Sequence, residues 1–170
     1  MSNVEVVALL VGAVACAIDI RTRRIPNTLT FPAIVLGIAA HAWSNGASGF
    51  TQALLGAGTG LAVFFPIFVL GGLGGGDVKL MAALGAWVGW HTVVWAGLYG
   101  AVAGGVLALA LSLSQGYLGQ ALTNIGGLFL YWSAEGLKPM PALTLAHGRG
   151  ARLPYAGPIF LGLLAALWGR

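Results

Sequence analysis

The residues of this chain best suited to chemistry are two aspartates, Asp19 and Asp77. Only four of the 170 residues are acidic, and these two border long apolar stretches. An ionisable side chain costs up to about 3 kcal/mol at mid-membrane and less near the interface, and such residues are usually functional. Each also has a simpler explanation, since nearby arginines could neutralise Asp19 and Asp77 could cap a helix N-terminus.

Two carboxyl groups held close in a low-dielectric site cannot both ionise easily, so one keeps a proton while the other does not. Such a pair is an acid and a base in one place. One carboxylate can deprotonate a water while the other polarises a carbonyl, which is the chemistry of aspartic proteases. The same pair could instead relay protons in a proton- or ion-coupled transporter, although no inverted repeat favours this. A non-catalytic membrane scaffold is a third, weaker alternative.

A run of glycines leads into Asp77, in the stretch "LGGLGGGDVKLM" at 70–81. Glycine adopts backbone angles that other residues avoid, so this run predicts a break between two helices. The missing side chains would also let an extended substrate backbone approach the aspartate. A phosphate-binding loop is disfavoured because no Gly-Lys-Ser/Thr sequence follows.

The composition indicates what kind of elements position these residues. The chain is 58% hydrophobic and 7% charged, whereas a soluble domain is about 25% charged. This predicts an integral membrane protein that contacts the lipid bilayer. The net charge of +4 comes from only eight basic residues, so no nucleic-acid partner is expected. No metal or cofactor is expected either, because metal-ligand spacing is lacking in the only cysteine and the three histidines: Cys16, His41, His91 and His147.

We predict an all-α polytopic membrane protein, a single integral-membrane domain over residues 1–170 with six transmembrane helices. A span needs about 17 to 25 apolar residues. Spans are predicted at 4–20, at 28–43 before the polar "SNGASG", at 52–73, twice within 80–114 with a turn near "GWHT", and at 153–168. The first is expected to be a retained helix, because positive charge follows it and does not precede it.

Basic residues in short loops predict the orientation. With the N-terminus outside, the six spans leave Arg170 outside and put seven basic residues on the cytoplasmic side: Arg21, Arg23, Arg24, Lys79, Lys138, Arg149 and Arg152. Asp19 and Asp77 then lie at the same depth, near the cytoplasmic face.

The segment 115–152 is the one extended stretch with polar character. Apolar residues recur in it at a helical period, at Leu118, Leu122, Ile125, Phe129 and Trp132. This predicts an amphipathic helix lying at the membrane interface, with a short buried helix as the alternative. Elsewhere, pairs of glycines four residues apart predict close helix packing and no chemistry: Gly56/Gly60, Gly85/Gly89 and Gly100/Gly104.

Taken together, these motifs resemble the type IV prepilin peptidase family of intramembrane aspartyl proteases. "GGGD" at 74–77 fits the GxGD signature, and "DIRTRRIPN" at 19–27 resembles the first-aspartate motif of the family. "GGGDVKLMAALGAWVG" at 74–89 is similar to the second motif, and "LPYAGPIFLG" at 153–162 resembles a late proline-containing motif. The similar segments cover most of the chain in the right order.

The resemblance implies a GxGD aspartyl protease-like bundle in the bacterial inner membrane. Such an enzyme cleaves the leader of a prepilin, or of a pilin-like protein, at the cytoplasmic face. The resemblance carries the catalytic roles of base and acid to Asp19 and Asp77, in an order that it does not assign. Gly74 and Gly76 are expected to shape the loop. Lys79 is expected either to contact substrate or, more simply, to anchor the topology.

Other residues of these motifs have structural interpretations. Pro26 and Asn27 are expected to stop the first helix and start the turn into the second. Pro154 and Pro158 are expected to loosen the last helix near the site. The oligomeric state has no signature in the sequence.

The chain departs from the larger enzymes of this family in one respect. Those enzymes have a long cytoplasmic insertion after the first helix, with paired CxxC motifs, and they N-methylate the new pilin terminus with S-adenosylmethionine. Here the first loop is about seven residues, and the single Cys16 excludes CxxC. We therefore expect the short, peptidase-only branch, like the enzymes that serve Flp-type tight-adherence pili.

Overall fold

The computed structural model of the chain describes residues 2–116, 118–138, 140 and 154–169, and these are all-helical in their regular structure. The helices are α1 (Asn3–Thr22), α2 (Asn27–Val69), α3 (Gly75–Ser114), α4 (Leu118–Glu135) and α5 (Ala156–Trp168). In the described part of the chain, α1, α2 and α3 are long and apolar enough to cross a membrane. The all-α prediction is therefore confirmed, and the helices are consistent with a membrane protein.

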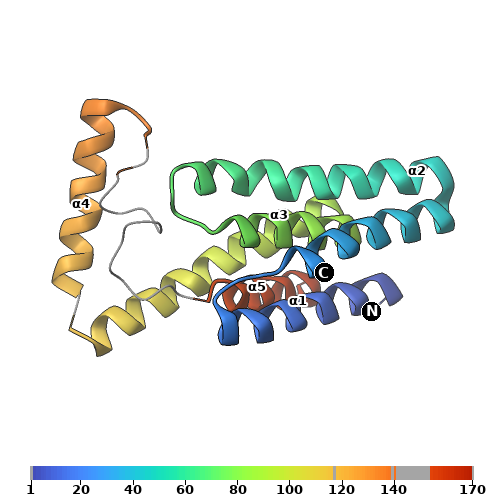
Figure 1. Ribbon diagram of the computed structural model, residues 1–170, viewed down its shortest axis with the longest axis horizontal. Helices are drawn as coiled ribbons and strands as arrows, with labels where there is room; N and C mark the ends of the chain where they lie inside the picture. Colours follow the sequence, from blue (N-terminus) through green and yellow to red (C-terminus); the bar gives the residue numbers. More distant parts are fainter. Residues whose placement is uncertain (1, 117, 139, 141–153, 170) are drawn as a thin grey trace.

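The four helices α1, α2, α3 and α5 form one bundle along the long axis of the molecule, whereas α4 projects from one end (Figure 1). Helix α3 is central, because it packs against α2, α5 and α1. In its first part, Val78 and every residue from Leu80 to Trp87 are buried. Helix α3 begins two residues before Asp77, so the aspartate directly precedes the most buried stretch of the bundle.

Helices α2 and α3 each fold back on themselves at a glycine (Figure 1). A straight helix of the 43 residues of α2 would be about 65 Å long, twice the roughly 30 Å of hydrocarbon in a bilayer. The reversals occur at Gly46 (φ 58°, ψ −140°) and Gly89 (φ 81°, ψ 169°), where positive φ favours glycine. They fall within the predicted "SNGASG" and "GWHT" segments. Six separate membrane crossings stay a prediction.

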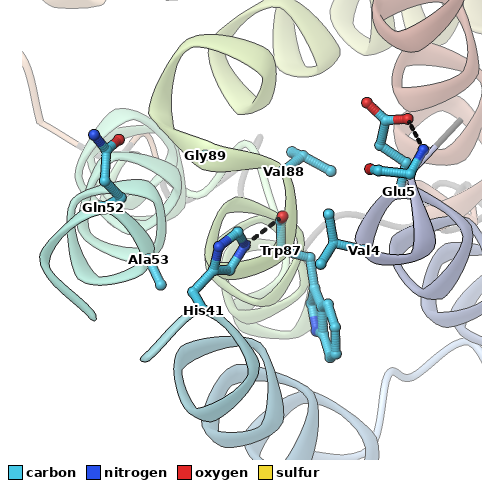
Figure 2. A pocket seen from close by; sticks show the side chains of 9 residues that line it. Val4, Glu5, His41, Gln52, Ala53, Trp87, Val88 and Gly89 are labelled. Atoms are coloured by element: carbon cyan, nitrogen blue, oxygen red, sulfur yellow. Dashed lines mark hydrogen bonds between the residues drawn. The ribbon is translucent and has the colours of Figure 1, made fainter. Parts of the chain in front are cut away.

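Two polar contacts join the end of the first arm of α3 to the first arm of α2. The indole N–H of Trp87 donates to the carbonyl of Ala33 at 2.8 Å. Nε2 of His41 lies 3.0 Å from the carbonyl oxygen of Trp87 (Figure 2). The Trp87 carbonyl lies two residues before the reversal at Gly89, where carbonyls lack regular helix partners, so the His41 contact meets a polar group where the chain reverses. His41 therefore has a structural partner, which could not be read from the sequence because it is a backbone carbonyl on another helix.

Glycines bring the backbones of α2 and α3 into direct contact. A Cβ atom added to Gly56 would collide with the carbonyl oxygen of Gly85, and one added to Gly60 would collide with the carbonyl oxygen of Met81. These glycines therefore act in close helix packing, as predicted. Gly89 has both predicted roles, because its Cα would lie 3.0 Å from a Cβ added to Gly56 and its positive φ makes it the reversal point of α3.

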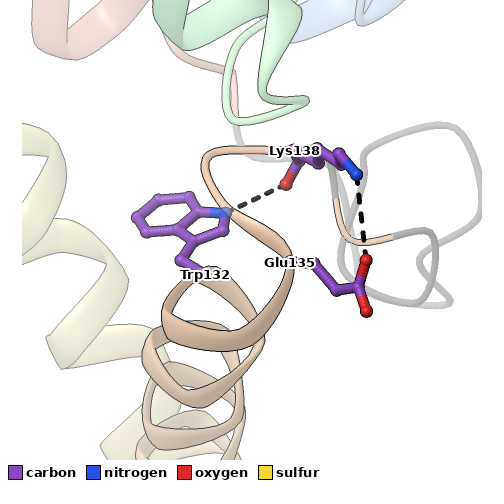
Figure 3. A network of polar contacts seen from close by, with 3 residues as sticks. All are labelled: Trp132, Glu135 and Lys138. Carbon is purple, nitrogen blue, oxygen red and sulfur yellow. Dashed lines mark hydrogen bonds and ion pairs between the residues drawn. The ribbon is translucent and has the colours of Figure 1, made fainter.

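Helix α4 confirms that the polar segment contains a helix. None of its described side chains is buried, so the alternative of a buried helix is wrong; location at the membrane interface stays a prediction. The helix ends at Glu135, followed by Gly136 with φ 77°. Past this end, the Trp132 indole donates to the carbonyl of Lys138 at 2.9 Å, and the Lys138 ammonium lies 3.8 Å from Glu135 (Figure 3).

Some predictions lie outside the described residues. They concern the start of the last span at Leu153 and the positions of His147, Arg149, Arg152 and Arg170. Within the described range, α5 begins at Ala156 with Pro158 in its first turn. Proline fits the first turn of a helix without breaking a hydrogen bond, so Pro158 does not loosen α5.

The contact between α2 and α3 predicts the effect of two alanine substitutions. Gly56→Ala should destabilise the bundle by roughly 1–3 kcal/mol, because overpacking forces the two backbones apart. Gly58→Ala is the matched control, since nothing lies within 4 Å of a Cβ there, and alanine favours a helix over glycine by about 1 kcal/mol. Thermal unfolding of the purified proteins in detergent measures both. Equal stability of the two variants would contradict this packing.

Candidate active site

Asp19 lies in the last turn of α1 and is only 6% exposed. Its Oδ2 atom accepts a hydrogen bond of 3.2 Å from the backbone N–H of Ala156, the first residue of α5. The N–H groups of a first helical turn have no partners within the helix and lie at the positive end of its dipole. The first and last helices of the described chain therefore meet at this buried carboxylate.

The three arginines that follow Asp19 are exposed, whereas Asp19 itself is buried: Arg21, Arg23 and Arg24. Helix α1 ends at Arg23, which has a left-handed backbone (φ 55°) and an N–H bonded to the Asp19 carbonyl oxygen at 2.8 Å. Neutralisation of the Asp19 charge by these arginines stays a prediction.

Asp77 is half-buried in the first turn of α3. Its Oδ2 atom accepts a hydrogen bond of 3.1 Å from the backbone N–H of Gly74. A carboxylate in this position satisfies an unpaired helix N–H and complements the helix dipole. Asp77 thus does cap its helix, as the simpler explanation proposed, but this bond uses only one of its two oxygens.

The structure brings the two aspartates into one site. α1 ends, α3 begins and α5 begins at the same end of the bundle (Figure 1), and Asp19 interacts electrostatically with Asp77. Two like charges in a partly desolvated site repel each other strongly. The arrangement suits two carboxyl groups that share a proton, which is the condition for acid and base chemistry on one substrate.

The loop before Asp77 depends on two glycines, Gly74 and Gly76. A Cβ on Gly74 would lie 3.0 Å from Oδ2 of Asp77, and a Cβ on Gly76 would lie 3.1 Å from the Cβ of Ile25. Ile25 belongs to the link between α1 and α2, so Gly76 lets the start of α3 pack directly on that link. The geometry agrees with the predicted loop-shaping role of both glycines. Gly75 is less restricted, since its Cβ would meet only a ring atom of Phe68 at 3.4 Å.

Lys79 points away from the carboxylates, toward the start of α2. Its ammonium donates a hydrogen bond of 2.9 Å to Oδ1 of Asn27 and lies 5.5 Å from the ring centroid of Phe31. A cation over an aromatic ring adds a favourable electrostatic contact. Lys79 thus ties the first turn of α3 to the first turn of α2, and Asn27 does more than begin a turn. Contact of Lys79 with a substrate stays a prediction.

Two further residues border the site and were not predicted as site residues, Tyr155 and Ala156. Ala156 supplies its backbone N–H to Asp19, and the half-buried Tyr155 directly precedes it, with its hydroxyl against Gly104 of α3. Their only signal was the motif "LPYAGPIFLG". A backbone donor leaves no mark in the side-chain sequence, and the place of Tyr155 depends on how α5 packs.

Other groups in the described residues offer no competing site for a metal. No cluster of three or more histidine, cysteine, aspartate or glutamate side chains there could hold a metal ion. A pocket of about 240 Å³ lies where α1 begins and α3 reverses (Figure 2), and its lining includes Glu5, His41 and Gln52. That end of the bundle is opposite the two aspartates, so the pocket is separate from the carboxylate site.

Comparison with known proteins gives a family and a set of relatives. The model of the type IV leader peptidase family matches residues 6–109. The chain is 38% identical over 100 residues to a prepilin leader peptidase/N-methyltransferase of Burkholderia pseudomallei. This alignment covers 55% of this chain and 32% of that protein. It is 32% identical over 132 residues to the protein of that name from Pseudomonas aeruginosa, covering 69% and 45%.

A third relative of the same name, from Escherichia coli, is 39% identical over 83 residues, covering 45% of this chain and 36% of that protein. The chain thus spans less than half the length of each of these three relatives. No solved structure matches it. The region that the family model matches contains both Asp19 and Asp77.

The contact between Lys79 and Asn27 predicts a measurable coupling. Lys79→Met and Asn27→Ala should each lower the free energy of unfolding, and the double variant should lose less than the sum, by about 0.5–1.5 kcal/mol. Denaturant unfolding in detergent measures this. Lys138→Met, at the exposed end of α4, is the control and should change stability by less than about 0.5 kcal/mol. Strictly additive losses for Lys79 and Asn27 would show that the two side chains do not interact.

Proposed function

The chain belongs to the type IV leader peptidase family, and on that premise we propose that it is a membrane-embedded aspartyl endopeptidase that removes the leader peptide of prepilins. The observation that carries the proposal is the meeting of Asp19 and Asp77 in one site at one end of the bundle. The relatives named as prepilin leader peptidases support the substrate class. Asp19 and Asp77 are proposed as the catalytic pair, with Gly74 and Gly76 shaping the loop beside them.

The proposed reaction is hydrolysis of one peptide bond by a water held between the carboxyl groups. The ionised carboxylate takes a proton from the water, and the new bond forms from the water oxygen to the carbonyl carbon. The protonated carboxyl donates a hydrogen bond to the carbonyl oxygen, on which the electron pair collects. When the bond to nitrogen breaks, the electron pair on the oxygen re-forms the carbonyl bond, and the leaving nitrogen takes the proton that the first carboxylate accepted from the water. The pair is then back in its starting protonation state. The Ala156 N–H and the Gly74 N–H keep one oxygen of each carboxylate in place throughout.

We further propose that the site faces the cytoplasm from the bacterial inner membrane. If the two arms of α2 and of α3 each cross the bilayer, then α1, these four arms and α5 make six crossings in a single peptidase domain. Exposed Arg21 and Arg24 lie at the same end of the bundle as the aspartates. Basic residues concentrate on the cytoplasmic side of short loops, which supports this orientation.

The carboxylate pair predicts the outcome of two isosteric substitutions. Asp19→Asn and Asp77→Asn should each reduce leader cleavage by at least roughly 100-fold, because each removes a proton-transfer group from the reaction. The measurement is cleavage of a purified prepilin by the purified enzyme in detergent or liposomes. Glu5→Gln is the matched control, since Glu5 lies at the opposite end of the bundle, and it should keep the wild-type rate. Full cleavage by either aspartate variant, with normal folding, would overturn the pair.

We also propose that the enzyme lacks methyltransferase activity and belongs with the short enzymes that process Flp-type pilins. The link from α1 to α2 runs only from Thr22 to Asn27, so no domain is inserted there. The named relatives combine peptidase and N-methyltransferase, and the chain matches less than half of each.

Incubation with a prepilin and S-adenosylmethionine labelled in its methyl group tests this proposal. Cleaved pilin should appear without label, because no part of the α1–α2 link can hold the methyl donor. A bifunctional relative serves as the positive control for labelling. Label in the pilin produced by this enzyme would reject the peptidase-only assignment while leaving the peptidase itself intact.

A further inference from the structure

Three of the six tryptophans have an indole N–H that makes no hydrogen bond within the described part of the chain. The indoles of the other three donate to protein acceptors, and they belong to Trp87, Trp95 and Trp132. The unbonded indoles are those of Trp43, Trp90 and Trp168, which are 94%, 50% and 92% exposed. An indole has a large apolar body and one donor, so these three side chains fit surroundings that are apolar and also offer acceptors.

Trp90 and Trp168 lie at the same level of the bundle. Trp90 directly follows the reversal of α3, and Trp168 is the last residue of α5. Helix α5 runs antiparallel to the second arm of α3 (Figure 1), and a Cβ added to Gly162 would collide with the carbonyl oxygen of Ala96. Trp168 is as far beyond Gly162 as Trp90 is before Ala96, so the two tryptophans are level with each other.

Trp43 lies near the same level on α2. Two residues before it, His41 contacts the carbonyl oxygen of Trp87, which is itself two residues before the reversal at Gly89. Trp43 therefore lies beside this reversal, shortly before α2 makes its own at Gly46. The three exposed tryptophans, which are far apart in the sequence, thus gather at the end of the bundle opposite the two aspartates. We call Trp43, Trp90 and Trp168 the tryptophan belt.

The layer of a bilayer just below its phosphates has the properties that the belt requires. The acyl chains begin there, and the ester carbonyl and phosphate oxygens accept hydrogen bonds; tryptophan is enriched at this depth in membrane proteins. The end that carries the carboxylates instead exposes Arg21 and Arg24. From Trp90 to Ser114 the second arm of α3 rises about 36 Å, which is enough to cross roughly 30 Å of hydrocarbon from the level of the belt.

We propose that the tryptophan belt binds the ester and headgroup layer of the leaflet opposite the carboxylates and so fixes the depth of the bundle. Two helices then give the depth of the carboxylates. Asp77 is about 20 Å from Trp90 along α3, and Ala156, which holds Asp19, is about 18 Å from Trp168 along α5. Because the hydrocarbon is roughly 30 Å thick, both carboxylates lie about 10 Å inside its opposite boundary.

The first test locates the belt in the intact protein, labelled with 5-fluorotryptophan and placed in lipid nanodiscs. Replacing one tryptophan at a time by phenylalanine assigns the six fluorine signals. A nitroxide on the lipid headgroup should broaden the signals of Trp43, Trp90 and Trp168 more than a nitroxide at the end of the acyl chain or a water-soluble paramagnetic reagent does. Trp87 is the internal control, because it is buried and already bonded to Ala33, and its signal should broaden least.

The second test measures the depth of the carboxylates. The variant Cys16→Ser/Ile20→Cys carries a spin label on an exposed position next to Asp19. The matched control is Cys16→Ser/Leu113→Cys, since Leu113 is as exposed as Ile20 but lies about 35 Å from the belt along α3. In liposomes the label at position 20 should collide with dissolved oxygen and be shielded from a water-soluble nickel chelate. The label at position 113 should be accessible to the chelate.

Several outcomes would overturn this placement. Stronger broadening of the three signals by the water-soluble reagent would mean that this end of the bundle stands in water. Strongest broadening by the acyl-chain label would put the belt near the middle of the bilayer. Signals that no lipid label affects but that change with protein concentration would assign the tryptophans to contact with a second copy. Equal access of the chelate to positions 20 and 113 would reject the depth of the carboxylates.

The placement of the belt does not depend on the proposed peptidase activity. Neither measurement uses a substrate, so failure to cleave any prepilin would reject the proposed function and leave both results standing. Conversely, a tryptophan belt found in water would reject this placement while leaving cleavage by Asp19 and Asp77 as it is.

Discussion

The hydrogen bond from the Ala156 backbone to the Asp19 carboxylate is the contact on which the rest of the site depends. A buried carboxylate without a partner is strongly destabilised, and here the partner comes from the opposite end of the sequence. This bond requires α5 to begin beside the end of α1. The same contact thus satisfies the carboxylate and fixes where the last described helix joins the bundle.

That contact is possible only because the helices approach very closely. Gly56 meets Gly85 between α2 and α3, and Gly162 meets the backbone of Ala96 between α5 and α3. Without a side chain at these points, helices pack at the distance of their backbones. Asp77 is then carried by the most buried arm of the bundle, while the glycines ahead of it leave the loop free to fit against Ile25. The buried arm that carries Asp77 and the glycine loop that leaves the approach to it free of side chains therefore lie within a few residues of each other.

Glycine pairs predicted from their spacing alone turned out to have different roles. Gly56 and Gly60 serve packing, as expected, but Gly89 reverses α3 and Gly104 receives the Tyr155 hydroxyl. The spacing is identical in each case, so it could not separate the packing role of Gly56 from the contact of Gly104 with Tyr155, whereas the turn at Gly89 was predicted from the segment "GWHT". The distinction comes from what lies opposite each glycine, which depends on the neighbouring helix. Lys79 is a similar case, since the sequence predicts Asn27 only as a turn residue, and the bond between the two depends on how the starts of α2 and α3 pack.

The sequence by itself determined that the protein is helical and apolar, where the long helices reverse, and which two carboxylates stand out. Those features are local, because composition, glycine positions and the rarity of charge can be read without knowing the neighbours in space. Only the tertiary structure decided that the N–H of Ala156 holds Asp19, that Lys79 binds Asn27, and that the Tyr155 hydroxyl lies against Gly104. These contacts join residues far apart in the chain, and one of them uses a backbone group that every residue except proline carries. Their geometry exists only after α1, α3 and α5 have packed together.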